Sequence, residues 1–330
     1  MSAADPLLLV ENLKVIFHGD RGALTHAVDG LDLSLKRGET LGLVGESGCG
    51  KSVTALSVMG LLPNTSAEMS GRIRFDGAEL LSLPDRDMRN LRGDRMAMIF
   101  QEPMTSLNPS FSIGEQIAES LIRHRGLSRA QARARTIELL RLVKIPSPEQ
   151  RVDDYPHRLS GGMRQRAMIA LALACDPQLL IADEPTTALD VTIQAQILAL
   201  LRELKASIGI AIILITHDLG VVAEICDHVA VMYAGEVVEY APVEALFAAP
   251  QHPYTVGLLG SIPRRDAKTG ELAVIEGMVP SMAEIPAGCR FAPRCPFVQE
   301  RCTQSPPPLA AVGSNHRSRC IRAPLEELVA

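Results

Sequence analysis

Residues 45–52, with the sequence GESGCGKS, fit the phosphate-binding pattern G-x-x-x-x-G-K-[ST]. Apolar residues 41–44 precede them and helix-forming residues 53–56 follow, so the strand–loop–helix setting that this pattern needs is present. The glycines allow backbone N–H groups to converge on phosphates, and the N-terminus of the following helix adds a favourable field. We therefore expect this P-loop to bind ATP, with Lys51 neutralising the β- and γ-phosphates and the Ser52 hydroxyl binding Mg²⁺. The predicted ATP contacts are Gly45, Glu46, Ser47, Gly48, Cys49, Gly50, Lys51, Ser52 and Val53.

Two adjacent carboxylates, Asp183 and Glu184, follow the short apolar segment 179–182. An apolar strand that delivers an acidic pair at its end is the second part of a nucleotide-hydrolysing site. We expect Asp183 to hold Mg²⁺ and Glu184 to polarise the attacking water. Adjacent carboxylates are also an ordinary feature of strand ends, so this interpretation depends on the presence of the P-loop in the same chain.

A third segment, 159–163 with the sequence LSGGM, places Ser160 and two glycines at the start of a predicted helix. A helix N-terminus of this kind binds anions, and a plain helix cap would explain Ser160 but not the repeated glycine. With this segment lying between the P-loop and the acidic pair, the chain resembles the ABC ATPase family. The resemblance implies a dimer with two ATP molecules between the subunits, in which Ser160, Gly161 and Gly162 contact ATP held by the partner's P-loop.

The resemblance extends to four more positions. Gln101 matches the Q-loop glutamine, which touches Mg²⁺ and the water and couples to the membrane domains. Asp190 ends a segment, 187–190, that matches the D-loop at the dimer interface. His217 matches the switch histidine that contacts the γ-phosphate, and Phe17 is the expected adenine-stacking aromatic. The resulting sets are Lys51, Gln101, Glu184 and His217 for catalysis, and Ser52, Gln101 and Asp183 for Mg²⁺.

Cys49 stands in the P-loop where many relatives carry a small residue without a thiol. Backbone donors and a helix N-terminus lower the pKa of a thiol. We therefore expect a reactive Cys49 whose alkylation blocks ATP binding, with an inert thiol as the alternative.

Four of the seven cysteines, Cys289, Cys295, Cys302 and Cys320, lie within one short stretch near the C-terminus. Their spacing is wider than the C-x₂₋₄-C pairs of common zinc sites and the C-x₂-C runs of bacterial ferredoxins. The spacing therefore names no metal, and four unligated thiols remain an alternative.

Segments 100–109, 252–255 and 288–296 resemble the oligopeptide/dipeptide/nickel importer subfamily of ABC ATPases. Some members carry a [4Fe–4S] cluster on four C-terminal cysteines, which implies a possible cluster on the four positions named above. The resemblance also implies two membrane permeases, an extracytoplasmic solute-binding protein and a second ATP-binding subunit, usually a different chain. The chain would then act at the cytoplasmic face of the membrane as half of a heterodimer.

The elements that must position these residues follow an α/β pattern. Strand patterns fill residues 7–44 and 72–75, with short strands at 7–10 and 13–17 and an alternation of Leu31, Leu33 and Leu35 that is typical of a half-buried strand. Long helices fill 112–142, and strands alternate with helices from 179 onward. The helix expected at 191–207 has Ile197, Leu201 and Leu204 on one face and ends at Gly209. The resemblance implies a P-loop NTPase core with an antiparallel β subdomain and a helical subdomain at about 105–165. We expect an ABC nucleotide-binding domain at 1–250 and a loop-rich C-terminal module at 251–330, where prolines and cysteines accumulate.

Composition narrows the function. The net charge of −5 argues against nucleic acid as the main partner. The long apolar runs around 168–175 and 208–215 are far short of the roughly 20 residues that span a bilayer, and the N-terminus has no signal-peptide pattern. We therefore expect a cytosolic chain that reaches the membrane through partners. A soluble ABC ATPase in nucleic-acid or ribosome-linked work is the alternative, but residues 53–158 lack the sustained heptads of a long coiled-coil insertion.

Overall fold

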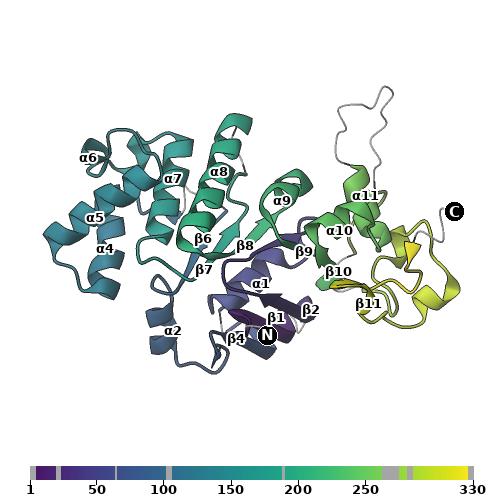
Figure 1. Ribbon diagram of the computed structural model, residues 1–330. Coiled ribbons are helices and arrows are strands. Elements are labelled where there is room, and N and C mark those ends of the chain that lie inside the picture. Colours follow the sequence, from purple (N-terminus) through teal and green to yellow (C-terminus); the bar gives the residue numbers. More distant parts are fainter. Residues whose placement is uncertain are drawn as a thin grey trace. The chain divides into compact units, whose positions relative to one another are not determined.

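A computed structural model describes residues 5–19, 24–63, 65–101, 106–187, 190–261, 275–280 and 285–325 (Figure 1). The residues form two compact units. Unit 1 consists of Met1–Leu35, Thr40–Leu81 and Ile215–Ala330, and unit 2 of Lys36–Glu39 and Ser82–Leu214.

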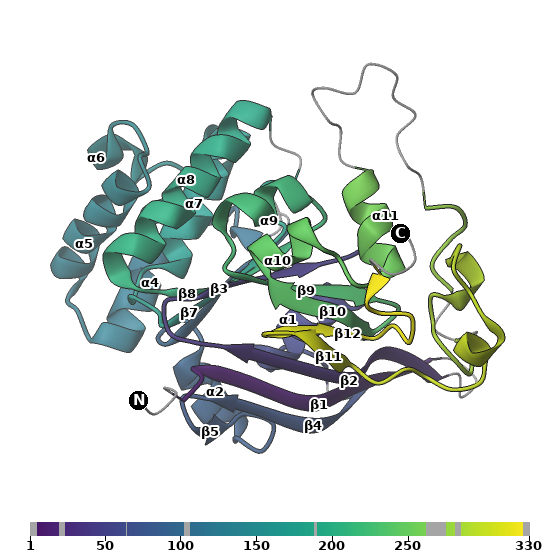
Figure 2. The same ribbon diagram turned by 45° about the vertical axis from the view of Figure 1, so that its right-hand side comes forward.

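The first sheet of unit 1 is antiparallel, with the strand order β2-β1-β4-β5 (Figure 2). Its strands are β1 (Leu8–His18), β2 (Leu24–Leu35), β4 (Ala67–Phe75) and β5 (Ala78–Glu79). Leu31, Leu33 and Leu35 are buried on β2 while Asp32 is exposed, which confirms the predicted half-buried alternation. The two short strands expected over 7–17 form a single strand, β1, with an irregular register after Val10.

The second sheet of unit 1 combines parallel and antiparallel pairs. Strand β3 (Thr40–Val44) runs parallel to β9 (His228–Tyr233), which pairs antiparallel with β10 (Glu236–Pro242). Strand β12 (His316–Ser318) then pairs with β10, and β11 (Ala310–Gly313) with β12, so the C-terminal segment extends this sheet. The helices are α1 (Lys51–Val58), α9 (Leu219–Ile225), α10 (Val243–Ala248) and α11 (Pro253–Gly260), with short 3₁₀ turns η3 (Ala292–Arg294) and η4 (Glu300–Thr303).

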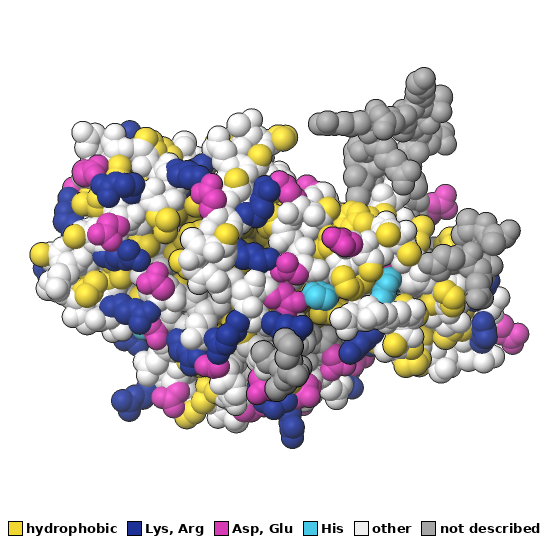
Figure 3. Space-filling view, in the orientation of Figure 1, with side chains coloured by type: hydrophobic (Ala, Val, Ile, Leu, Met, Phe, Trp, Pro, Cys, Tyr) yellow, Lys and Arg dark blue, Asp and Glu magenta, His cyan; other side chains and the backbone are white. Residues whose placement is uncertain are grey.

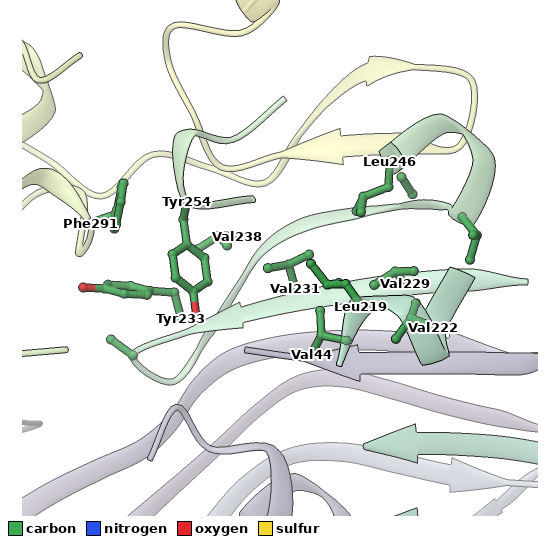
Figure 4. Packing of buried hydrophobic residues seen from close by; sticks show 13 residues of the cluster. Val44, Leu219, Val222, Val229, Val231, Tyr233, Val238, Leu246, Tyr254 and Phe291 are labelled. Atoms are coloured by element: carbon green, nitrogen blue, oxygen red, sulfur yellow. The ribbon is translucent and has the colours of Figure 1, made fainter. Parts of the chain in front are cut away.

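One hydrophobic core joins the P-loop strand of unit 1 to the C-terminal segment. Val44 at the end of β3 and Val231 on β9 lie in the same cluster as Tyr254 and Phe291 (Figure 4). The Tyr233 ring meets those of Tyr254 and Phe291 edge to face, with centroids 4.7 and 5.2 Å away. Such aromatic contacts stabilise a core beyond the area that they bury. The segment after residue 250 therefore packs into the core that supports the P-loop.

Unit 2 carries most of the helices. Its strands have the order β8-β7-β6, where β6 (Met96–Ile99) runs parallel to β7 (Leu179–Asp183), and β8 (Ala211–Thr216) begins in this unit. Its helices are α2 (Asp85–Leu91), α4 (Ile113–Arg125), α5 (Arg129–Leu142), α6 (Pro148–Arg151), α7 (Gly161–Ala172) and α8 (Val191–Ile208), with a 3₁₀ turn η2 (Pro156–Arg158). In the view of Figure 3, basic and acidic side chains mix over the part that carries α4 and α5.

Local signals explain where these helices begin and end. Ser112 and Ser128 each form a capping box at the start of α4 and α5. Gly126 and Gly209 end α4 and α8 in the left-handed conformation that glycine adopts without strain. Among the residues described, no helix combines the length and the apolar character needed to cross a bilayer.

Candidate active site

The P-loop joins β3 to α1 and lies tightly against neighbouring backbone. A Cβ atom on Gly45 would lie 2.2 Å from the carbonyl oxygen of Met232, and one on Gly50 would lie 2.5 Å from that of Ala27. Both glycines have positive φ, 151° and 101°. Only glycine satisfies both the conformation and the close approach. Strand β9 and strand β2 therefore fix the path of the loop, while Ser47 at its crest is exposed.

The Lys51 side chain folds back over the loop. Its Nζ donates to the carbonyl oxygens of Gly45, at 2.7 Å, and Glu46, at 2.9 Å, and the residue is buried. The ammonium group is thus held beside the loop from which backbone donors would reach a phosphate. Ser52 and Val53 follow in the first turn of α1, half-buried.

Glu46 has contacts that its position in the motif did not reveal. Its backbone N–H donates to the Tyr254 hydroxyl at 2.9 Å, and its carboxylate pairs with Arg294 at 2.8 and 3.1 Å. Both partners are more than 200 positions away along the chain. The sequence predicted Glu46 only as part of the ATP contact set, and that role stays a prediction.

The structure contradicts the expectation for the Cys49 thiol. Cys49 is fully buried, and its Sγ lies 3.8 Å from Lys51 Nζ. Burial raises the pKa of this thiol, and this effect outweighs the lowering by the neighbouring ammonium. The prediction of a lowered pKa is therefore wrong, because the thiol is turned into the protein and away from the exposed crest of the loop.

The acidic pair lies at the end of β7 in unit 2. Asp183 is buried as the last residue of the strand, and Glu184 follows with a φ of 46°. The Glu184 carboxylate accepts hydrogen bonds from Thr187 Oγ1 at 2.7 Å and from Gln101 Nε2 at 3.2 Å. Unit 2 therefore brings Gln101 and Glu184 together, while the catalytic role predicted for both stays a prediction. Thr187 is a contact that sequence reasoning did not assign to the carboxylate, although it lies three residues away in the same turn.

The LSGGM segment forms the start of α7. The helix begins at Gly161, so both glycines lie in its first turn, and Ser160 caps it by accepting from Met163 N–H at 3.3 Å. A Cβ atom on Gly162 would lie 3.1 Å from Ile193, whereas one on Gly161 would meet nothing within 4 Å. Asp190 caps α8 in the same way, through Ile193 N–H at 2.9 Å. The rest of the predicted D-loop, residues 188–189, lies outside the described residues.

Two further predicted residues belong to unit 1. Phe17 lies near the end of β1, paired with Thr25 and half-buried. His217 is exposed between β8 and α9, whose N-terminus is capped by the neighbouring Asp218. The roles of both stay predictions. The predicted nucleotide residues are thus distributed over the two units, with the P-loop in unit 1 and the acidic pair in unit 2.

The four C-terminal cysteines line one small pocket of unit 1, together with His252. Burial raises the pKa of three of these thiols, that of Cys289 to about 11, and the other cysteines of the group raise it further. Among the described residues, no three His, Cys, Asp or Glu side chains are arranged to hold a single metal ion. The sequence predicted a common role for these cysteines, and the structure brings them to one place.

Known proteins share this architecture. The ATP-binding cassette MJ0796, in a dimeric post-hydrolysis state bound to ADP and Pi, matches with a TM-score of 0.65 and 28% identity over 72% of this chain and 98% of that one. The family description "ABC transporter" matches residues 28–187, and "Oligopeptide/dipeptide transporter, C-terminal region" matches residues 238–302. The fold and its P-loop therefore define an ABC-type ATPase, which confirms the predicted fold class and enzyme class.

Two curated relatives match over nearly their whole length. The oligopeptide transport ATP-binding protein OppD of Salmonella typhimurium is 51% identical over 99% of this chain and 96% of its own. The oligopeptide transport ATP-binding protein AppD of Bacillus subtilis is 52% identical over 96% of both chains. The chain belongs to the oligopeptide/dipeptide group of ABC transporter ATP-binding subunits, as its motifs indicated.

Proposed function

We propose that this chain hydrolyses ATP to drive import of di- or oligopeptides, or of a related small solute, through two membrane permeases. The transport functions named for its relatives and the match of its C-terminal region support the substrate class. The assembly would also contain an extracytoplasmic solute-binding protein and a second ATP-binding subunit, in a heterodimer. The chain would work at the cytoplasmic face of the membrane. Residues 1–250 would form the ATP-binding domain and residues 251–330 its C-terminal module.

The observation that best supports ATP hydrolysis is the fixed orientation of the Glu184 carboxylate. Two donors, Thr187 and Gln101, orient this group at the end of β7. A carboxylate held in this way can accept a proton from the water that attacks the γ-phosphorus. Lys51 would neutralise charge on the β- and γ-phosphates, and His217 would contact the γ-phosphate. Mg²⁺, when bound by Ser52, Asp183 and Gln101, would neutralise charge on the phosphate oxygens.

The start of α7 supports ATP contact across a dimer. Gly161 has open space where a side chain would stand, and no neighbour in the described part of this unit demands a glycine there. Close approach of a ligand is the usual reason for glycine at a helix N-terminus that binds phosphate. We therefore assign Ser160, Gly161, Gly162 and Asp190 to contacts with ATP held by the second subunit.

A groove in unit 2 is our candidate for the permease contact. It has a volume of about 980 Å³ and is bordered by α4, α5 and the segment around Tyr155. Its lining includes Arg123, Arg129 and Arg133, the acidic Glu115 and Asp153, and the apolar Ile122. A short amphipathic helix from a permease would meet both charges and apolar surface there.

We also propose that Cys289, Cys295, Cys302 and Cys320 hold a [4Fe–4S] cluster. Four thiols on one pocket are the donor set of such a cluster, and bound iron would stabilise them as thiolates. The test is iron and sulfide analysis of anaerobically purified protein. About four iron and four sulfide per chain would support the cluster. Stoichiometric zinc, or no metal at all, would refute it.

Transport is tested by reconstitution. The chain, its second ATP-binding subunit and the two permeases would be placed in vesicles with the solute-binding protein and a labelled peptide. We expect ATP-dependent uptake that disappears with Glu184→Gln and persists with Arg74→Ala, a control that alters an exposed ion pair with Glu11. ATP hydrolysis stimulated by DNA or ribosomes, without peptide uptake, would overturn the proposal.

A further inference from the structure

One arginine of the segment between Cys289 and Cys295 contacts the P-loop directly. Arg294 lies in η3, and its side chain is only 6% exposed. Its guanidinium forms a two-pronged ion pair with Glu46, from Nη1 to Oε2 at 2.8 Å and from Nη2 to Oε1 at 3.1 Å. Paired parallel hydrogen bonds of this kind fix orientation as well as distance. The position of Glu46 is thus tied to the cysteine-bearing segment.

Glu46 in turn contacts Lys51, the lysine of the P-loop. The same residue that binds Arg294 through its carboxylate accepts Lys51 Nζ at its carbonyl oxygen, at 2.9 Å. Its N–H is held by the Tyr254 hydroxyl of α11 at 2.9 Å. The carboxylate, N–H and carbonyl of one residue therefore each have a defined partner, two of them from the chain after residue 250.

A second arginine of the same segment supports the other side of the loop. Arg290 is buried, donates to the Ala234 carbonyl and pairs with Asp29 and Glu236. The next residue after Ala234, Gly235, donates its N–H to the Cys49 carbonyl at 3.0 Å. The P-loop is thus braced at Glu46 and at Cys49 by contacts that begin at Arg294 and Arg290.

Packing alone does not account for Arg294. The guanidinium of this pair is buried while the Glu46 carboxylate is partly exposed, and well-packed apolar side chains commonly stabilise a fold as well as, or better than, an ion pair taken out of water. The aromatic cluster beside it, Tyr233 with Phe291, already supplies apolar contact. What the ion pair adds is a fixed geometry at Glu46.

We propose that Arg294 is a positioning residue of the ATP site, which couples the four-cysteine segment to the placement of Lys51 through Glu46. The inference rests on the proposed role of the P-loop in binding ATP. It assigns no chemical step to Arg294, because this residue touches the P-loop and not the reacting atoms. Replacing Arg294 should weaken the binding of ATP more than the binding of ADP, because Lys51 acts on the β- and γ-phosphates and ADP lacks the γ-phosphate.

The experiment measures binding of Mg-ATP and Mg-ADP to the purified full chain by titration calorimetry. For Arg294→Ala we expect affinity for Mg-ATP to fall about tenfold, the loss of roughly one charge-assisted hydrogen bond, with a smaller fall for Mg-ADP. Arg294→Lys keeps the charge but not the two-pronged geometry, so its affinity for Mg-ATP should lie between those of the wild type and Arg294→Ala. Glu46→Gln tests the same contact from the other side and keeps the P-loop backbone groups. Combined with Arg294→Ala it should weaken binding no further than either change alone.

The matched control is Arg301→Ala. Arg301 also immediately precedes a cysteine of the group, Cys302, but it is exposed and bonds to Gln299. We expect its affinity for both nucleotides to stay within about twofold of the wild type. Thermal melting checks that each variant is folded. If Arg294→Ala is unfolded, the binding of nucleotides by Glu46→Gln is the test of the inference.

Two results would overturn the inference. One is an Arg294→Ala protein that binds both nucleotides like the wild type, and the other is an equal loss in Arg301→Ala. Lys51→Ala separates this failure from failure of the proposed ATP site. If Lys51→Ala binds Mg-ATP normally, the P-loop assignment itself is wrong. If it does not bind while Arg294→Ala does, only the coupling is wrong.

Discussion

His252 predicts a specific acid sensitivity of the fold. It is 1% exposed at the start of α11, where its Nδ1 accepts the Tyr254 N–H at 3.1 Å. A protonated ring could not accept this hydrogen bond and would bring a charge into the core. Burial, with a smaller contribution from the charge of Arg319, lowers the pKa of His252 from 6.5 to about 3. The folded protein therefore holds this imidazole neutral.

The size of the effect follows from linkage. Below pH 6.5 the unfolded chain binds a proton at His252 that the folded chain excludes, so folding stability is lost as pH falls from 6.5 towards 3. Each pH unit in that window removes about 1.4 kcal/mol. Between about pH 7.5 and about pH 5.5, this one residue should lower the free energy of unfolding by about 1.4 kcal/mol. Above the unfolded-state pKa, His252 is neutral in both states, so its titration takes nothing from the free energy of unfolding there.

The assay compares urea unfolding of the wild type and His252→Asn at these two pH values, followed by circular dichroism because the chain has no tryptophan. Asparagine can also cap a helix, so the substitution keeps an acceptor while removing the titrating group. Its packing defect acts at both pH values and cancels in the difference. His157→Asn, at an exposed position, controls for the loss of one imidazole. If His252→Asn loses as much stability on acidification as the wild type, the reasoning is wrong.

Three further predictions concern the ATP site. Glu184→Gln should lower ATP hydrolysis about a hundredfold or more while ATP still binds, as measured by phosphate release and calorimetry; hydrolysis near the wild-type rate would remove Glu184 from catalysis. Cys49, buried with a raised pKa, should stay unmodified when the folded protein is treated with N-ethylmaleimide and analysed by mass spectrometry, and rapid labelling would contradict this. Gly45→Ala should destabilise the fold by about 2 kcal/mol or more and abolish ATP binding, because its Cβ would lie 2.2 Å from the Met232 oxygen; normal melting and binding would show that the loop adapts.

The features that the sequence predicted well are those encoded locally. Ser112 and Gly209 mark helix ends through contacts within a few residues, and the expected apolar face of α8, with Ile197 and Leu201, is buried. The P-loop was predicted for the same reason, since its glycines and Lys51 lie in one short segment. Gln101 needed the family resemblance, because a single glutamine far from Glu184 in sequence carries no pattern of its own.

The features that the sequence did not reveal depend on distant contacts. The pKa of Cys49 was predicted in the wrong direction because the local motif shows a helix N-terminus but not the burial of the thiol. The pairing of Glu46 with Arg294 joins residues 248 positions apart, and neither residue departs from what an exposed loop would contain. The hydrogen bond from Thr187 to Glu184 was missed because a hydroxyl in a turn has many ordinary partners.

The position of the two arginines would give the proposed cluster a structural role. Arg290 and Arg294 lie in a segment whose only regular structure is the single turn η3. Both arginine side chains are nonetheless buried beside the P-loop, each paired with a carboxylate that stays partly exposed. Cys289 and Cys295 stand at the two ends of this segment, so ligation of both would close it into a short loop and limit its freedom in the unfolded chain. A cluster held there would act as a structural staple for the P-loop brace, a role that requires no electron transfer.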